Sequence, residues 1–295
     1  MVQKETVKEE DKVIVKNRML TNFAKLTESG EHRKFKGELK VGVDLGTANT
    51  VLAVVDKNNK PIAGISAPSQ AIKDGVIVNY FESMQLVTKL KEELEERLGT
   101  TLTYAAAAIP PGVSEGCVKS IGHVLEGAGF EVCNIVDEPT AAAAVLDIKE
   151  GAVVDVGGGT TGISILKDGK IVYTADEATG GTHMTLTVSG HYNIPYEEAE
   201  SLKRDKEKET EIFPVVKAVV EKMASITQKF LKGYEVPAVY VVGGSCNFKD
   251  FEKVFSKWLK LPVYKPDYPL MVTPLGIAYL CELPKVEETP EKEKK

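Results

Sequence analysis

The features of this sequence best suited to chemistry are two glycine-rich turns, each of which follows an apolar strand containing an aspartate. The first is Val41-Gly-Val-Asp-Leu-Gly-Thr-Ala-Asn-Thr50 and the second is Val153-Val-Asp-Val-Gly-Gly-Gly-Thr-Thr-Gly162. Glycine lets a tight turn bring its backbone N–H groups close to a ligand, because no Cβ stands in the way. Turns of this kind can cradle a phosphate group.

The aspartate before each turn, Asp44 or Asp155, adds a second part to the predicted site. A carboxylate repels phosphate, but it can hold a hydrated Mg²⁺ ion that bridges to phosphate oxygens. One isolated copy would fit a flexible turn beside a capping aspartate equally well. Two copies of strand, aspartate, turn and strand instead predict two similar halves that hold one nucleotide from both sides of a cleft.

Composition limits the classes of protein that this chain can belong to. It has 295 residues, of which 43% are hydrophobic and 27% are charged, as is usual for a globular protein of about two domains. The net charge of −6 argues against a nucleic-acid groove, which needs a basic surface. We therefore expect no nucleic acid among its partners.

Cysteine, histidine and hydropathy patterns further limit the expected metal sites and the expected cellular compartment. The four cysteines form no Cys-x-x-Cys pair, and the four histidines lack the spacing of metal ligands. No apolar run reaches membrane-spanning length, and the first ten residues lack the core of a signal peptide. These patterns predict a soluble cytoplasmic protein with reduced thiols and without a membrane partner.

The surrounding pattern predicts an α/β protein in two lobes with charged ends. The apolar stripe of residues 1–36 predicts a helix ending near Gly30 that docks on the body, or alternatively a partner-binding tail. We expect 37–149 plus 272–283 to form lobe I and 150–271 to form lobe II. The polar segment 284–295 is predicted to be a disordered tail.

Within the lobes, strands and helices alternate in a way that predicts βαβ connections, with ligands bound beyond the carboxyl ends of the strands. The charged run 201–211 is typical of a solvated turn or helix end. The expected strands are 40–47, 50–56, 61–66, 103–109, 131–136, 151–157, 162–167, 170–178 and 238–242. The expected helices are 80–98, 114–127, 140–146, 181–192, 196–203, 214–231 and 273–280.

Five segments between residues 41 and 280 resemble, in order, the five motifs of the actin, heat-shock-chaperone and sugar-kinase ATPase superfamily. They are the two turns above, Asp137-Glu-Pro-Thr-Ala-Ala-Ala143, Val241-Val-Gly-Gly-Ser245 and Pro274-Leu-Gly-Ile-Ala-Tyr279. The resemblance implies two ribonuclease-H-like lobes with ATP and Mg²⁺ between them and reduced outer subdomains. The short chain is most similar to the chaperone-like proteins of ethanolamine utilisation, and the bacterial actin-like proteins share the first motif.

The resemblance also implies roles for individual residues near the phosphates. Asp44 and Asp155 would hold Mg²⁺ through water, and Glu138 would orient the attacking water. An alternative for Glu138 is a charge that stabilises a helix N-terminus. The residues implied to donate hydrogen bonds to the β- and γ-phosphates are Gly46, Thr47, Gly157, Gly158, Gly159 and Thr160.

At the nucleoside end, the resemblance places Gly243 and Gly244 against the adenosine, where a side chain would block the purine. These glycines also fit a plain turn at the end of a strand. Glu200 and Lys203 would reach the ribose and adenine from one helix face, although an exposed helix commonly carries the same residues.

Two departures from the motifs predict slow hydrolysis. Position 162 is Gly where the heat-shock chaperones carry an acidic residue, and position 48 is Ala where they carry a second Thr. Both changes remove a polar group near the γ-phosphate. We therefore expect at most weak ATPase activity.

Three hypotheses for function follow. The first is an ATP-binding switch with weak ATPase activity that aids assembly or reactivation of the ethanolamine-degrading machinery. Its client would be a protein of ethanolamine catabolism or of its bacterial microcompartment. The second is an actin-like filament-forming protein. The third is a small-molecule kinase, for which no segment long enough for a sugar pocket and catalytic base is found.

Overall fold

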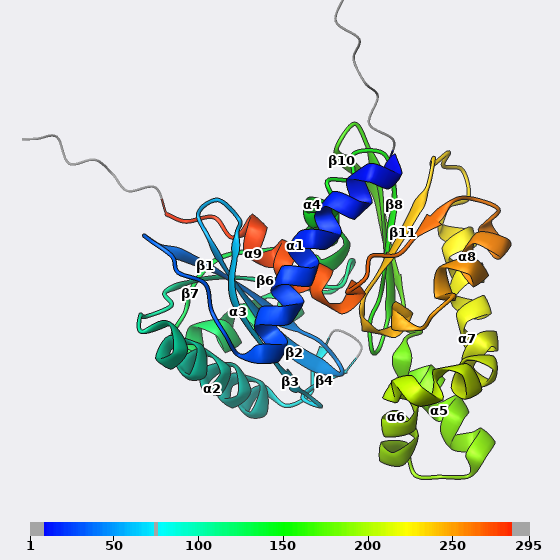
Figure 1. The fold of residues 1–295 in the computed structure, drawn as a ribbon, viewed down its shortest axis with the longest axis horizontal. Helices are drawn as coiled ribbons and strands as arrows, with labels where there is room; N and C mark the ends of the chain where they lie inside the picture. The colour runs from blue at the N-terminus through cyan, green and yellow to red at the C-terminus, as the bar shows by residue number, and fades with distance from the viewer. Residues whose placement is uncertain (1–8, 74–75, 285–295) are drawn as a thin grey trace, which may run out of the picture.

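Two five-stranded mixed sheets form the framework of the protein (Figure 1), whose computed structural model describes residues 9–73 and 76–284. The first sheet has the order β3 (Pro61–Pro68), β2 (Asn49–Asp56), β1 (Leu39–Leu45), β6 (Tyr104–Ile109) and β7 (Glu131–Asp137). The second has the order β10 (Lys170–Glu177), β9 (Thr161–Lys167), β8 (Gly151–Val156), β11 (Val239–Val242) and β12 (Val263–Tyr264).

The two sheets repeat one topology. In each, three strands form an antiparallel meander, and two further strands then add in parallel through helical crossovers. The first hairpin of each meander is closed by one of the glycine-rich turns. Asp44 pairs with Val51 across the first hairpin, and Asp155 pairs with Gly162 across the second. The two halves therefore place equivalent aspartates at equivalent positions.

Helices cover the sheets and begin or end at the expected residues in several cases. Ser114 caps α3, since its side chain accepts a hydrogen bond from the N–H of Cys117, and Gly99 ends α2 with φ 65°. None of the helices in the described part of the chain is both long and apolar enough to cross a membrane. The helices of the first half are α2 (Tyr80–Leu98), α3 (Glu115–Gly127) and α4 (Glu138–Leu146), joined later by α9 (Val272–Leu280).

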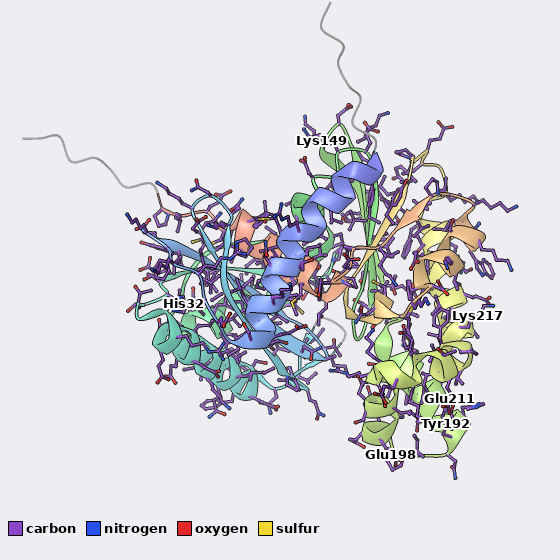
Figure 2. The ribbon with its side chains drawn as sticks, in the orientation of Figure 1. His32, Lys149, Tyr192, Glu198, Glu211 and Lys217 are labelled. Carbon is purple, nitrogen blue, oxygen red and sulfur yellow. The ribbon has the colours of Figure 1, made fainter. Side chains whose placement is uncertain are left out.

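The second half is covered by α5 (Gly181–Tyr192), α6 (Tyr196–Arg204), α7 (Glu209–Phe230) and α8 (Phe251–Leu259). One expectation was wrong here, and two elements were missed. Helix α7 begins at Glu209 rather than Pro214, so the end of the charged run is helical. The hydroxyl of Tyr192 donates to Glu211 (3.2 Å), which ties the end of α5 to the first turn of α7 (Figure 2). The two missed elements are the nine-residue helix α8 and the two-residue strand β12, which were not predicted from the sequence.

The N-terminal helix α1 (Glu9–Ser29) lies across both halves (Figure 1). It packs on β3 and also contacts α4 and α9. Leu20 and Phe23 are completely buried in an apolar cluster that includes Val51 of β2, Val153 of β8 and Leu275 of α9. The expectation of a docked helix therefore agrees with the described side chains. The side chains of residues 13 and 14, and all of residues 285–295, lie outside the described part.

Helix α9 returns the chain from the second half and packs tightly against the first. A Cβ on Gly276 would overlap with the carbonyl group of Ala141 in α4. A Cβ on Gly42 in β1 would likewise overlap with the backbone of α9 at Pro274 and Ala278. Glycine is needed at both positions because the backbone of α9 lies directly against the backbones of α4 and β1.

Replacement of Gly276 by alanine is expected to lower the free energy of unfolding by about 3 kcal/mol, because the added methyl group forces α9 away from α4. Gly190→Ala is the matched control, since a Cβ on this helical glycine meets nothing within 4 Å. That control should be neutral or stabilising by up to about 1 kcal/mol. Urea denaturation measures both, and equal stabilities of the two variants would contradict the close packing of α9.

Candidate functional site

A cleft of about 540 Å³ opens between the two halves, and both glycine-rich turns line it. This volume is in the usual range for a small-molecule site. The structure brings together every residue selected from the sequence, while the ligand group that each would contact stays a prediction. The residues concerned are Asp44, Gly46, Thr47, Glu138, Asp155, Gly157, Gly158, Gly159, Thr160, Glu200, Lys203, Gly243 and Gly244.

The first turn leaves backbone donors available at the cleft. The N–H of Gly46 donates to the carbonyl oxygen of Asn49 (3.0 Å), and the N–H of Ser69 donates to that of Ala48 (3.2 Å). Within the described residues, the N–H groups of Thr47 and Ala48 make no backbone hydrogen bond. Successive unpaired N–H groups of this kind attract an anion.

Two hydrogen bonds to its first carbonyl group fix the second turn in place. The carbonyl oxygen of Gly157 accepts hydrogen bonds from the N–H of Gly181, the first residue of α5 (3.0 Å), and from Oγ of Ser245 (2.7 Å). The N–H groups of Gly158 and Gly159 make no backbone hydrogen bond within the described part of the chain. The turn therefore has its carbonyl side fixed and N–H groups available.

The two turns meet each other across the cleft. A Cβ on Gly158 would lie 3.2 Å from Cβ of Thr47 and 3.1 Å from Cβ of Ala48. A side chain at Gly158 would therefore push the two halves apart. The unpaired N–H groups of the two turns therefore belong to segments that lie next to each other in the cleft.

Three carboxyl groups line the cleft near the turns. Burial raises the pKa of Asp44 to about 7, and the neighbouring charge of Asp155 adds to this shift. Burial also raises the pKa of Asp155 to about 6, although the hydroxyl of Thr273, which donates to Asp155 Oδ2 (2.5 Å), opposes the change. Burial, followed by the charges of Asp155 and Asp44, raises the pKa of Glu138 well above its usual range.

This concentration of acidic groups fits a cation. None of the three shifts is offset by a described lysine or arginine. Among the described residues, no three His, Cys, Asp or Glu side chains are arranged to hold a metal ion directly. The arrangement therefore fits a hydrated ion that Asp44 and Asp155 would contact through water.

Glu138 is the first residue of α4, but it is not the residue that caps the helix. Asp137 caps it, because Asp137 Oδ1 accepts a hydrogen bond from the N–H of Thr140 (2.9 Å). Ser164 Oγ in the second sheet donates to the same oxygen (3.4 Å). The Glu138 side chain lines the cleft instead. As an acidic residue in the first turn of α4, Glu138 also fits the alternative of a charge that stabilises the helix N-terminus, and both roles stay predictions.

A polar network from α6 also lines the cleft. Lys203 Nζ lies 2.7 Å from Glu200 Oε2, and it donates to Thr185 Oγ1 (2.7 Å). Although burial favours its neutral form, the charge of Lys203 and hydrogen bonds to the carboxylate hold the pKa of Glu200 below its usual value. Arg204 donates through Nε to Glu200 Oε1 (2.5 Å) and through Nη1 to Asn49 Oδ1 of the first half (3.4 Å). Arg204 was not selected from the sequence, although its i, i+4 spacing from Glu200 could have indicated it.

Gly243, at the end of β11, has a structural reason to be glycine. Its φ is 90°, and a Cβ would overlap with the carboxylate of Asp155. Its N–H donates to the carbonyl oxygen of Pro269 (3.0 Å). The requirement for glycine here therefore follows from Asp155, whatever ligand binds.

Two sheets of the same order around a cleft with two glycine-rich turns define the actin-like ATPase fold. The family model of the cell division protein FtsA matches residues 152–276, and the MreB/Mbl protein model matches residues 63–203. The crystal structure of MreB 5 of Spiroplasma citri bound to AMPPNP superposes with a TM-score of 0.64 at 19% identity, covering 82% of this chain and 95% of that chain. The predicted fold class is confirmed.

Closer relatives define the family. The ethanolamine utilization protein EutJ of Salmonella typhimurium is 44% identical over 241 residues, which is 81% of this chain and 85% of that protein. The crystal structure of EutJ from Carboxydothermus hydrogenoformans has a TM-score of 0.87 and 45% identity, covering 90% of this chain and 98% of that chain. The chain belongs to the EutJ family of ethanolamine utilization proteins.

The raised pKa of Asp44 makes stability depend on pH. The folded protein keeps this proton up to about pH 7, whereas an unfolded chain releases it near pH 4. The stabilising contribution is therefore fully present below about pH 4 and is lost as the pH rises toward 7. We expect Asp44→Asn to reduce the fall in the free energy of unfolding between pH 5 and pH 8.

Urea denaturation without nucleotide or Mg²⁺ measures this difference. Asp168→Asn, in the exposed turn between β9 and β10, is the matched control and should keep the wild-type pH dependence. If Asp44→Asn loses as much stability as the wild type between the two pH values, the proton on Asp44 is not the cause.

Proposed function

We propose that this protein is an ATP-binding switch with slow, Mg²⁺-dependent ATPase activity that serves ethanolamine utilization. The observation that carries the proposal is the pair of glycine-rich turns, one from each half, that meet in the cleft with unpaired backbone N–H groups beside three carboxyl groups. An anionic ligand with several phosphates would use both turns at once. Such a ligand would therefore join the two halves.

The residues of the cleft divide this task between them. The turns at Thr47 and at Gly158 would bind the phosphates through N–H groups. Asp44 and Asp155 would hold the hydrated Mg²⁺, which, when bound, would offset the phosphate charge. Glu200 and Lys203 also line the cleft, and they would contact the nucleoside.

Hydrolysis would depend on Glu138, which lines the cleft beside the two aspartates. A carboxylate with a raised pKa is a stronger base, and so it is suited to accept a proton from an attacking water. Gly162 provides no acidic group of its own. For this reason we propose slow turnover, in which the bound nucleotide persists long enough to act as a signal.

The proposed signal is the relative position of the two halves. Arg204 of α6 reaches Asn49 of β2 across the cleft, so a ligand that enters there must disturb or replace a contact between the halves. We propose that this change is read by a protein client of ethanolamine catabolism or of its microcompartment. The proposed link to ethanolamine catabolism rests on membership of the EutJ family.

Asp44→Asn and Asp155→Asn should each weaken MgATP binding about tenfold or more, because each removes a charge that faces the hydrated cation. Titration with a fluorescent ATP analogue, with and without Mg²⁺, measures the change. Asp168→Asn should bind as the wild type does. Saturating MgATP should also raise the melting temperature of the wild type. Unchanged affinity in both cleft variants would reject the proposed site.

Glu138→Gln should lower the single-turnover rate of ATP hydrolysis by about 10²-fold or more, while leaving MgATP affinity nearly unchanged. The substitution keeps the size of the side chain but removes the group that accepts the proton. Measurement at saturating MgATP separates chemistry from binding. Equal rates for the two proteins would reduce Glu138 to a charge at the start of α4.

The two alternative functions have distinct signatures. An actin-like filament would scatter light when MgATP is added, and a small-molecule kinase would release ADP only when its acceptor is present. We expect neither MgATP-dependent scattering nor stimulation of ADP release by ethanolamine or sugars. Either signal would replace the proposed function with the corresponding alternative.

A further inference from the structure

Three neighbouring strands place Asp155, Gly162 and Asp176 in one row across the second sheet. Gly162 of β9 pairs with Asp155 of β8 on one side and with Asp176 of β10 on the other. Residues that pair directly across strands project from the same face of a sheet, about 5 Å apart from one strand to the next. Gly162 therefore leaves a gap between two carboxylates on the face nearest the cleft.

The side chain of Asp176 reaches into this gap. A Cβ on Gly162 would lie 3.2 Å from Asp176 Oδ1, 3.4 Å from Pro111 Cδ and 3.7 Å from Pro139 Cγ. A longer side chain at position 162 would have to displace the carboxylate. The Asp176 carboxylate therefore occupies the space beside Gly162. This position lies next to Pro139, the residue that follows Glu138.

The chain after Asp176 is fixed to the second turn. The hydroxyl of Thr161 donates to the carbonyl oxygen of Thr179 (2.5 Å). A Cβ on Gly180 would lie 2.7 Å from the carbonyl oxygen of Gly157, so no side chain fits between this segment and the turn. The end of β10 is thereby held in place relative to the cleft.

Asp176 also acts electrostatically on Glu138. Burial is the main cause of the raised pKa of Glu138, and four charged neighbours add to it: Asp155 of β8, Asp44 of β1, Asp176 of β10 and Asp137 at the start of α4. Asp176 is not among the residues that line the cleft, whereas Glu138 is. Asp176 would therefore act on chemistry in the cleft indirectly, and Glu138 is the cleft residue whose pKa it shifts.

We propose that Asp176 supplies, from the neighbouring strand, the acidic group that position 162 lacks, and that it positions Glu138 for the attack of water on ATP. This inference rests on the proposed ATPase function. In that reaction, the water oxygen bonds to the γ-phosphorus as the bond to the β–γ bridging oxygen breaks, and Glu138 accepts the proton. Asp155 and Asp44 act more strongly on Glu138 than Asp176 does, but a bound Mg²⁺ would offset their charges. The charge of Asp176 would then remain and, by repulsion, direct the Glu138 carboxylate into the cleft.

The first test compares Asp176→Asn with Glu177→Gln, a neighbouring exposed residue of β10 whose side chain points to the opposite face. Asp176→Asn should lower the single-turnover rate by about 10-fold to 100-fold, the usual effect of losing a residue that orients a reacting group. Its MgATP affinity should stay within about twofold of the wild type. Glu177→Gln should change neither quantity.

The second test moves the carboxylate to the other strand. Gly162→Asp alone should lower the melting temperature of the ligand-free protein, because the new side chain meets Asp176. Adding Asp176→Gly should restore the melting temperature and bring the rate back to within about threefold of the wild type. A purely structural role for Asp176 predicts no recovery of the rate.

The outcomes separate this inference from the function on which it rests. If the wild type hydrolyses MgATP and Asp176→Asn does so equally fast, the role of Asp176 is wrong and the proposed function stands. Parallel losses of rate, affinity and melting temperature in Asp176→Asn would show a structural role and would also overturn the inference. If the wild type binds MgATP without hydrolysing it, the ATPase proposal fails and the role of Asp176 fails with it.

Discussion

The removal of the carboxyl groups of Asp44, Asp155 and Glu138 from water, close to one another in one cleft, is the constraint on which the rest of the structure depends. Burial raises the free energy of all three ionised groups, and like charge adds to this for Asp44 and Glu138, which is why the pKa values are raised. The fold compensates only in part, through the Thr273 hydroxyl that donates to Asp155. A cation or a bound proton relieves the remainder, so protonation, cation binding and stability are coupled in this cleft.

The duplicated topology explains why these groups meet. Each half places its aspartate at the same position of a central hairpin, and tight packing of α9 against β1 and α4 fixes the halves around one apolar cluster. Helix α1 contributes Leu20 and Phe23 to that cluster. The carboxyl groups of the cleft are therefore positioned by the packing of this apolar cluster. A change in that packing would alter the geometry of the cleft.

Much of this arrangement could be predicted from the sequence, because apolar strands bounded by glycine are strong local signals. The selected residues do line one cleft. Local signals failed at Pro214, where the helix had already begun at Glu209, and in α8, whose short apolar pattern was missed. The spacing from Glu200 could have indicated Arg204, but its contact with Asn49 could not be predicted, nor could that of Asp176 with Gly162, because these pairs become neighbours only after the chain folds.

Hydrogen–deuterium exchange of the backbone amides, with and without MgATP, tests the central claim most directly, since that claim concerns the N–H groups of both turns. The account predicts that MgATP slows exchange at residues 46–49 and at residues 157–160 together, with the same dependence on nucleotide concentration. Protection of one turn only, or of neither turn at saturating MgATP, would contradict the binding of a single nucleotide by the two halves.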